Sequence, residues 1–157
     1  MGSGLYHLLR EPGAQAQLRA HPECMASAVE EMFRFATPVK HFVRTATRDF
    51  ELRGKTVRAG QELALLYHSA NFDEEVFDEP LRFRPDRSPN RHIAFGFGVH
   101  ACLGQNLARA SMRVFFTELL ARTEHIALDG QPQFIATNQV GGLKTLPVRA
   151  QAARLAA

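Results

Sequence analysis

Residues 95–104 read FGFGVHACLG and lie directly before the strongest helical pattern of the chain, at residues 103–122. Gly96 and Gly98 can adopt backbone angles that are closed to other residues, and they let a large group approach the backbone. Cys102 then stands at the start of the helix, where unpaired backbone N–H groups and the helix dipole favour a thiolate over a thiol. A thiolate presented by a glycine-rich loop predicts a metal ligand or a nucleophile.

Other uses of Cys102 have to be weighed against this prediction. A lone cysteine is most often a small buried hydrophobic residue. A zinc site could begin with His100 and Cys102, but no second pair of ligands follows at close spacing. The Cys-x-x-Cys-His pattern of c-type haem attachment is absent. A catalytic Cys–His pair is possible, but His100 has no evident partner to orient it.

The complete string resembles the haem-binding loop of the cytochrome P-450 family, Phe-Gly-x-Gly-x-His-x-Cys-x-Gly, with every defined position filled. The resemblance implies haem b (iron protoporphyrin IX) as cofactor, with Cys102 binding the iron through sulfur. It also implies that Phe95 packs beside this ligand and that His100 donates a hydrogen bond to a haem propionate. Three glycines shape the loop or let the helix lie near the haem: Gly96, Gly98 and Gly104.

A second motif lies in the helical pattern at residues 25–35, where Glu31 and Arg34 are one turn apart among apolar neighbours. It resembles the Glu-x-x-Arg signature of the same family, which joins its helix to the segment before the haem ligand. A buried pair of this kind needs further partners, because an uncompensated buried charge is costly. By its distance from the haem loop, Arg87 is the predicted third partner, with Arg82 and Arg84 as rivals.

Further positions take their roles from the resemblance alone. Arg44 lies in a strand-like stretch and is expected to grip a haem propionate in bidentate fashion. Residues 37–42 and 141–146 match segments that border the substrate pocket. Cys24 carries no motif and is interpreted as structural.

Composition limits the class of protein. The 157 residues suit one domain, and 45% hydrophobic and 22% charged residues are typical of a globular chain. The net charge of +3 comes without a block of like charges, so no nucleic-acid partner is expected. No apolar run of membrane-spanning length and no signal-peptide pattern occurs, so no membrane partner is expected. Two cysteines are too few for a disulfide framework and favour a reducing, cytoplasmic location.

Local patterns predict a mainly α fold with a small β component (α+β). Helices are expected at residues 5–10, 13–20, 25–35 and 103–122, and strands at 42–45, 50–52, 55–57 and within 126–148. The second and third strands form a hairpin about Arg53-Gly54. Residues 71–93 are expected to be irregular, and the run at 63–68 is too short to assign. The last helix has one apolar stripe, made by Leu103, Leu107, Ala110 and Val114, then Phe115 and Leu119.

The resemblance covers residues 5–148, but complete members of the family are well over twice this length. Residues 1–157 are therefore expected to be the C-terminal haem-binding portion of an incomplete cytochrome P-450 fold. The resemblance implies that the N-terminal part of the family, with the distal acid and threonine that assist oxygen activation, is not among these residues. No catalytic residue beyond the haem ligand is expected in this chain.

The function that the resemblance implies is a bacterial monooxygenase, which inserts one oxygen atom from O2 into a small organic substrate. Electrons would come from a ferredoxin- or flavodoxin-type donor that docks near Arg109 and Arg113. One alternative is a truncated, catalytically inactive haem-binding fragment or subunit, whose partner would be a missing N-terminal half. A weaker alternative is a cysteine hydrolase, which would bind no haem.

Overall fold

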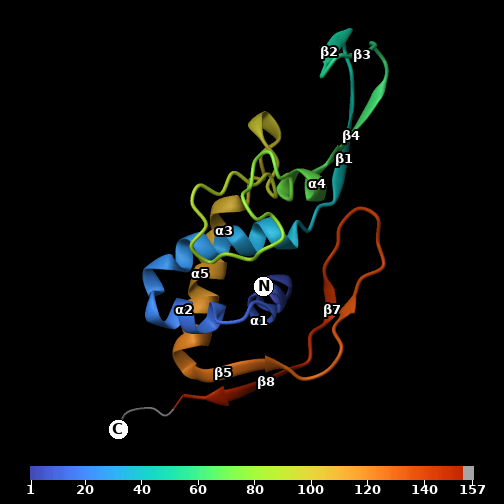
Figure 1. Ribbon diagram of the computed structural model, residues 1–157. Helices are drawn as coiled ribbons and strands as arrows, with labels where there is room; N and C mark the ends of the chain where they lie inside the picture. The colour runs from blue at the N-terminus through green and yellow to red at the C-terminus, as the bar shows by residue number, and fades with distance from the viewer. Residues whose placement is uncertain (154–157) are drawn as a thin grey trace.

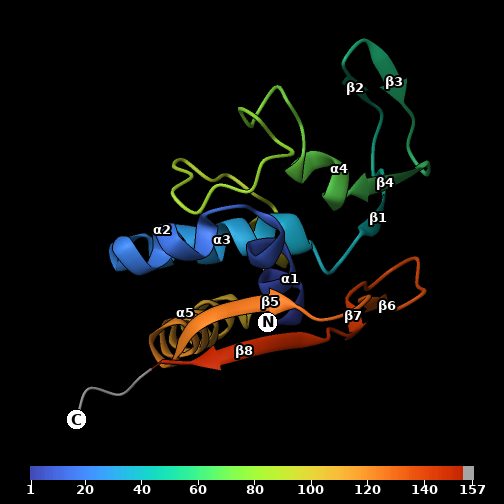
Figure 2. The same ribbon diagram turned by 60° about the horizontal axis from the view of Figure 1, so that its bottom comes forward.

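The computed structural model describes residues 1–153, and these form a helical body with antiparallel strand pairs at its edges (Figures 1 and 2). The helices are α1 (Gly2–Arg10), α2 (Ala14–Ala20), α3 (Met25–Ala36), α4 (Tyr67–Asn71) and α5 (Gln105–Arg122). Single 3-10 turns occupy Pro22–Cys24 and Gly98–His100. The predicted α+β class is confirmed. The helices predicted at 13–20, 25–35 and 103–122 differ from α2, α3 and α5 by one or two residues at their ends, whereas α1 begins three residues earlier than predicted.

The strands form four antiparallel pairs: β1 (His41–Thr45) with β4 (Glu62–Leu66), β2 (Phe50–Leu52) with β3 (Lys55–Val57), β5 (Thr123–Leu128) with β8 (Val148–Ala152), and β6 (Gln133–Phe134) with β7 (Leu143–Thr145). Arg53 and Gly54 both have positive φ, 47° and 73°, as a tight two-residue hairpin turn requires, which confirms the predicted hairpin. The unassigned run at 63–68 lies in β4 and the start of α4. The arm formed by β1–β4 and β2–β3 projects away from the helices (Figure 1).

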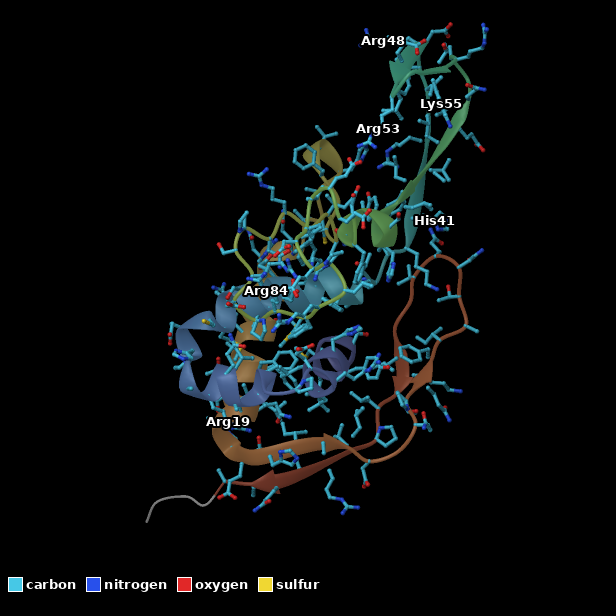
Figure 3. All side chains as sticks on the ribbon, viewed as in Figure 1. Arg19, His41, Arg48, Arg53, Lys55 and Arg84 are labelled. Carbon is cyan, nitrogen blue, oxygen red and sulfur yellow. The ribbon has the colours of Figure 1, made fainter. Side chains whose placement is uncertain are left out.

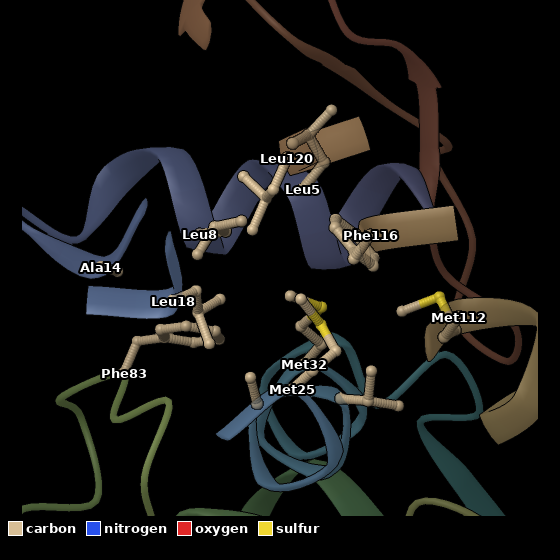
Figure 4. Close-up of a cluster of buried hydrophobic side chains, with 12 residues drawn as sticks. Leu5, Leu8, Ala14, Leu18, Met25, Met32, Phe83, Met112, Phe116 and Leu120 are labelled. Atoms are coloured by element: carbon tan, nitrogen blue, oxygen red, sulfur yellow. The ribbon is translucent and has the colours of Figure 1, made fainter. Parts of the chain in front are cut away.

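The hydrophobic core lies between α1, α2, α3 and α5 (Figure 4). Each of these helices supplies a large, fully buried side chain to it: Leu8, Leu18, Met32 and Phe116. Helix α3 is the central element, because it contacts both α1 and α5 and also supplies Glu31 and Arg34. The core therefore fixes the orientation of the helix that carries the Glu-x-x-Arg motif.

Helix α3 ends at Ala36, because the next residue, Thr37, has a φ of 30° that breaks the helical path before Pro38. The Thr37 hydroxyl donates to the Arg34 carbonyl (2.6 Å) and accepts a bond from the Asn71 side-chain amide (2.8 Å). These two bonds offset the cost of a left-handed conformation at a β-branched residue. The chain is thus turned out of the helical body and into β1.

The apolar stripe predicted for the last helix coincides with its buried side only at Phe115 and Leu119, which are partly buried against the core. Met112, Phe116 and Leu120 are the α5 side chains that are buried in the core. Leu107 and Val114 remain 73% and 65% exposed, and Leu103, just before the helix, is fully exposed. Helical periodicity alone could not select the buried face, because α5 is apolar on more than one side.

Two further features concern the helices and the cysteines. None of the helices in the described range 1–153 combines the length and hydrophobicity required to cross a bilayer. Cys24 and Cys102 are both free thiols.

Candidate functional site

A cavity of about 540 Å³ opens between the C-terminal end of α3, strand β1 and the loop before α5. The Cys102 thiol lies at this cavity and is exposed. Aromatic and aliphatic groups form most of the wall, and Arg44 and His100 supply basic groups. The lining residues are Phe33, Pro38, Val39, Phe42, Arg44, Tyr67, Ala94, Phe95, Gly96, His100 and Cys102.

The cysteine loop is held by its own backbone. The Cys102 N–H donates to the Phe95 carbonyl at 2.8 Å, and the Ala101 N–H donates to the Gly98 carbonyl at 3.0 Å. Gly96 has φ of 73°, and a Cβ at this position would lie 3.3 Å from the His100 carbonyl oxygen. Gly96 is thus required both for its left-handed backbone and for the close return of the loop. The loop aims the Cys102 side chain away from the core.

The other two loop glycines differ in their surroundings. Gly98 also has a positive φ (64°), a backbone conformation that is unfavourable for residues with a side chain. Gly104 precedes α5 with φ of −82°, and a Cβ there would meet no atom of the described chain within 4 Å. Phe97 and Val99 are 87% and 97% exposed. Much of the apolar surface of the loop therefore has no packing partner among residues 1–153.

The Glu-x-x-Arg motif forms a buried ion pair, with Glu31 and Arg34 completely inaccessible to solvent. Arg34 donates from Nε and Nη2 to the two Glu31 carboxylate oxygens, both at 2.8 Å. Arg87 donates from Nε to Glu31 Oε1 at 3.0 Å and is the third member of the group. The predicted rivals play lesser parts, since Arg84 offers only its backbone N–H to Glu31 and Arg82 only its carbonyl to Arg34 and Arg87.

Burial would raise the pKa of Glu31, but the hydrogen bonds and charges, foremost those of Arg34, lower that pKa below its ordinary value. Arg34 also donates to the carbonyls of Asn71 and Pro80, both at 2.8 Å, and Arg87 donates to the Asp78 carbonyl at 2.7 Å. The ion-pair group therefore binds the backbone of the irregular segment at 71–93. This segment leads directly into the cysteine loop, so the group is a structural anchor for the loop.

Arg44 extends from β1 into the cavity, where its Nη1 donates to the Val43 carbonyl at 2.9 Å. Its guanidinium lies 5.6 Å from the centroid of the Phe42 ring. Phe42 and Arg44 point to the same side because alternate residues of a strand share a face. The structure therefore brings Arg44, His100 and Cys102 to one cavity from two separate parts of the chain.

Sequence reasoning missed a second polar group behind the cysteine loop, formed by Glu30, His92 and Arg109. Arg109 donates from Nε and Nη2 to the Glu30 carboxylate at 2.7 and 3.0 Å, and His92 Nε2 lies 3.0 Å from Glu30 Oε2. Burial would raise the pKa of Glu30, but bonds to His92 and Arg109 lower it to about 2. No local pattern in the sequence indicated this group, because Glu30 is 62 residues from His92 and 79 residues from Arg109.

This arrangement changes the expected role of Arg109. Arg109 was expected to present a positive charge to a docking electron-donor protein. Its guanidinium is instead paired with Glu30 and lies over the Phe95 ring, 4.6 Å from the ring centroid. Arg113, one turn further along α5, is exposed. Of the two residues, only Arg113 offers an exposed cationic side chain.

The two segments expected to border a substrate pocket lie side by side. Val39 and Val140 form an isolated antiparallel bridge. The Lys40 N–H donates to the Gln139 carbonyl at 2.8 Å, and the Gly141 N–H donates to the Pro38 carbonyl at 2.7 Å. Pro38 and Val39 are thereby held as one wall of the cavity that Cys102 lines. Thr37, Lys40, Gly141 and Gly142 line a different cavity instead.

A zinc site built from this chain finds no support in the structure. Within residues 1–153, no three His, Cys, Asp or Glu side chains gather closely enough to hold a metal ion together. His100 and Cys102 line the same cavity without a further pair of such ligands. A metal ion at Cys102 would therefore need ligands other than the His, Cys, Asp and Glu side chains of residues 1–153.

Comparisons with known proteins agree on one family. Residues 7–152 match the family described as Cytochrome P-450. Cytochrome P-450-terp of a Pseudomonas species is 45% identical over 148 residues, which are 94% of this chain and 35% of that protein. The steroid C26-monooxygenase of Mycolicibacterium smegmatis is 41% identical over 150 residues, 94% of this chain and 37% of the relative.

The structural comparison agrees with the sequence comparison. The crystal structure of CYP108D1 from Novosphingobium aromaticivorans matches 97% of this chain and 37% of its own, with a TM-score of 0.88 and 45% identity. The chain thus spans little more than a third of the length of these relatives. Because the match covers nearly all of its described residues in both sequence and structure, the chain belongs to the cytochrome P-450 family.

Proposed function

We propose that the cavity at Cys102 holds haem b and that the protein acts as a haem-thiolate monooxygenase on a small organic substrate. Proteins of this family bind haem b. The observation that carries the proposal is the meeting of an exposed thiol, two basic side chains and apolar walls in one cavity. Cys102 would bind the iron, and Arg44 and His100 would bind the propionates.

The residues present fit this group in chemical type. A porphyrin needs a broad apolar surface, and Phe33, Phe42 and Phe95 offer aromatic walls. Its two propionates need donors, which the Arg44 guanidinium and the His100 ring provide. A thiolate is a known axial ligand of haem iron, and Cys102 is the thiol at this cavity.

When bound, haem supplies the activation of oxygen, which a thiolate ligand promotes by donating electron density. The protein residues have supporting tasks. The Cys102 N–H to Phe95 carbonyl bond holds the loop closed, and Arg109 covers the outer face of the Phe95 ring. Glu31, Arg34 and Arg87 anchor the segment from which the loop emerges.

We further propose that residues 1–157 are the C-terminal haem-binding portion of a cytochrome P-450 domain. The relatives' greater length and the exposed Leu103, Leu107 and Val114 support this, because apolar surface of this kind is suited to a packing partner. The second candidate is a catalytically inactive haem-binding fragment or subunit. The observation that favours it is that the chain matches only 35% of the length of cytochrome P-450-terp.

The proposed electron donor is a ferredoxin- or flavodoxin-type protein, for which the exposed Arg113 would be one docking charge. A cytoplasmic setting is proposed because the free thiols of Cys24 and Cys102 are compatible with a reducing compartment.

The test is the absorption spectrum after haemin addition, dithionite reduction and carbon monoxide treatment. The chain is examined alone and together with the separately produced N-terminal portion of cytochrome P-450-terp. A strongly red-shifted Soret band reports thiolate ligation. Cys102→Ser should abolish the band, whereas Cys24→Ser, which removes the other free thiol, should retain it.

Lack of haem binding under both conditions would contradict the proposal, as would an unchanged band in Cys102→Ser. Turnover of an organic substrate with an added reductase then separates the two candidates. A monooxygenase consumes oxygen and forms hydroxylated product when the N-terminal portion is present, but a haem-binding subunit retains the spectrum without forming product.

A further inference from the structure

A second cavity, of about 770 Å³, lies between α1, the end of α3, the start of β1 and the loop that joins β6 to β7. We call it the basic cavity because basic side chains from three parts of the chain line it: His7, Arg10, Lys40, His41 and His68. Among residues 1–153, no Asp or Glu side chain lines it. None of these five side chains forms an ion pair with a carboxylate of the described chain.

The basic cavity is separate from the cavity at Cys102, although β1 borders both. His41 lines the basic cavity, whereas Phe42 and Arg44 line the other. Because successive strand residues point to opposite faces, β1 acts as a wall between the two spaces. The same division follows at the start of α4, where Tyr67 lines the Cys102 cavity and His68 the basic cavity.

His7 is uncharged in this basic cavity. Burial, and to a smaller extent the nearby positive charge of Arg10 and of His68, together lower the pKa of His7 to about 4. At neutral pH the His7 ring is therefore uncharged and can donate one hydrogen bond, while Arg10 and Lys40 carry the charge. An anion in this cavity would meet two fixed cations and neutral donors without carboxylate competition.

The walls of the basic cavity also offer apolar contact. The Tyr6 and Phe134 rings, from α1 and β6, meet edge to face with centroids 5.5 Å apart. Both rings line the cavity, together with Leu66 and Ile135. Its volume is within the range of small-molecule sites, which combine apolar walls with a few polar groups that orient the ligand.

We propose that the basic cavity binds a small organic carboxylate with an apolar body. Arg10 and Lys40 attract the carboxylate, and Tyr6 and Phe134 contact the body. The Lys40 ammonium already reaches across the cavity mouth, where it donates to the Thr137 carbonyl at 2.5 Å. This site needs no haem and is independent of the function proposed for Cys102.

Hydrogen–deuterium exchange at low micromolar protein concentration tests the site with three probes. Benzoate carries both charge and ring, acetate only the charge, and benzyl alcohol only the ring. We expect benzoate to slow exchange saturably in peptides covering residues 1–12 and 37–44, at concentrations up to about 20 mM. Acetate and benzyl alcohol should require at least about tenfold higher concentrations for equal protection.

The matched variants have equal net charge. Arg10→Gln with Lys40→Gln should weaken benzoate protection at least about tenfold. Arg48→Gln with Lys55→Gln, which removes two cations from the distant β2–β3 arm, should leave it unchanged (Figure 3). All four side chains are exposed and make no ion pair within residues 1–153, so the variants should remain folded.

Three results would overturn the proposal. One is the absence of saturable protection by benzoate in the unmodified chain, a measurement that does not depend on any variant. Another is protection by benzyl alcohol at the same concentrations as benzoate, or a loss of benzoate protection that is equal in the two double variants. Either outcome would show that Arg10 and Lys40 have no role in binding. The third is protection confined to residues 94–104, which would assign benzoate to the Cys102 cavity.

Discussion

The guanidinium of Arg109 lies over the ring of Phe95, with its carbon 4.6 Å from the ring centroid. Phe95 in turn accepts a hydrogen bond from the Cys102 N–H through its carbonyl. Glu30 fixes the guanidinium through two hydrogen bonds, and Gln105 accepts a third at 2.9 Å. A chain of contacts thus runs from α3 through α5 to the residue that carries the free thiol.

Arg109→Met should loosen the cysteine loop without unfolding the helices. It removes the bidentate ion pair and the cation over the ring, together worth about 1–2 kcal/mol. We expect amide exchange in residues 93–104 to be about tenfold faster, as measured by mass spectrometry. Arg113→Met on the same helix is the control, and equal exchange rates in the two variants would contradict the assignment.

Glu31→Gln should destabilise the whole chain strongly. The change leaves Arg34 and Arg87 buried without their carboxylate, and breaking such a group costs about 3–5 kcal/mol. Urea unfolding followed by circular dichroism measures the loss. The control is Glu118→Gln, whose ion pair with Arg122 is exposed and is worth about 0.5 kcal/mol or less. Similar unfolding midpoints for the two variants would disprove the anchoring role of Glu31.

His7 should make the chain less stable as the pH falls from 6.5 to 4. The unfolded chain takes up a proton at the ordinary pKa of 6.5, but the folded chain does so only at about 4. Acidification through this window therefore favours the unfolded state, by about 2–3 kcal/mol at its lower end. His7→Phe, which can keep the ring contacts to Tyr6 and Phe35, should remove this part of the pH dependence.

Urea midpoints at pH 7 and pH 4 provide the measurement for His7. His125→Gln, a change at an exposed histidine of β5, serves as the control and should retain the pH dependence of the unmodified chain. A His7→Phe variant that loses stability on acidification as steeply as the unmodified chain would rule out this contribution.

The exposed apolar side of α5 should cause self-association of the isolated chain. Leu107 and Val114 lie two helical turns apart on this side and are largely exposed. Leu107→Glu with Val114→Glu should increase the monomer fraction in analytical ultracentrifugation, because each substitution replaces exposed apolar surface with charge. Thr117→Glu, at an exposed polar position of the same helix, should change it little. A monodisperse monomer of the unmodified chain would contradict the expectation.

Several features of this protein follow from residues that are close together in sequence. The loop at 95–104 depends on positive φ at Gly96 and Gly98, and the β2–β3 turn depends on positive φ at Arg53 and Gly54. Glu31 and Arg34 meet because three residues make nearly one helical turn. These relationships need only local backbone geometry, and so the sequence was sufficient to predict them.

Other features required the packed structure. Only the contact of α5 with α1 and α3 decided that Met112 and Phe116 are buried while Leu107 and Val114 stay exposed. The meeting of Glu30 with His92 and Arg109 joins residues 62 and 79 positions apart, and the basic cavity draws His7 and His68 together. Periodicity and motifs describe one segment at a time, whereas the helix face that is buried and the charges that meet depend on how distant segments pack.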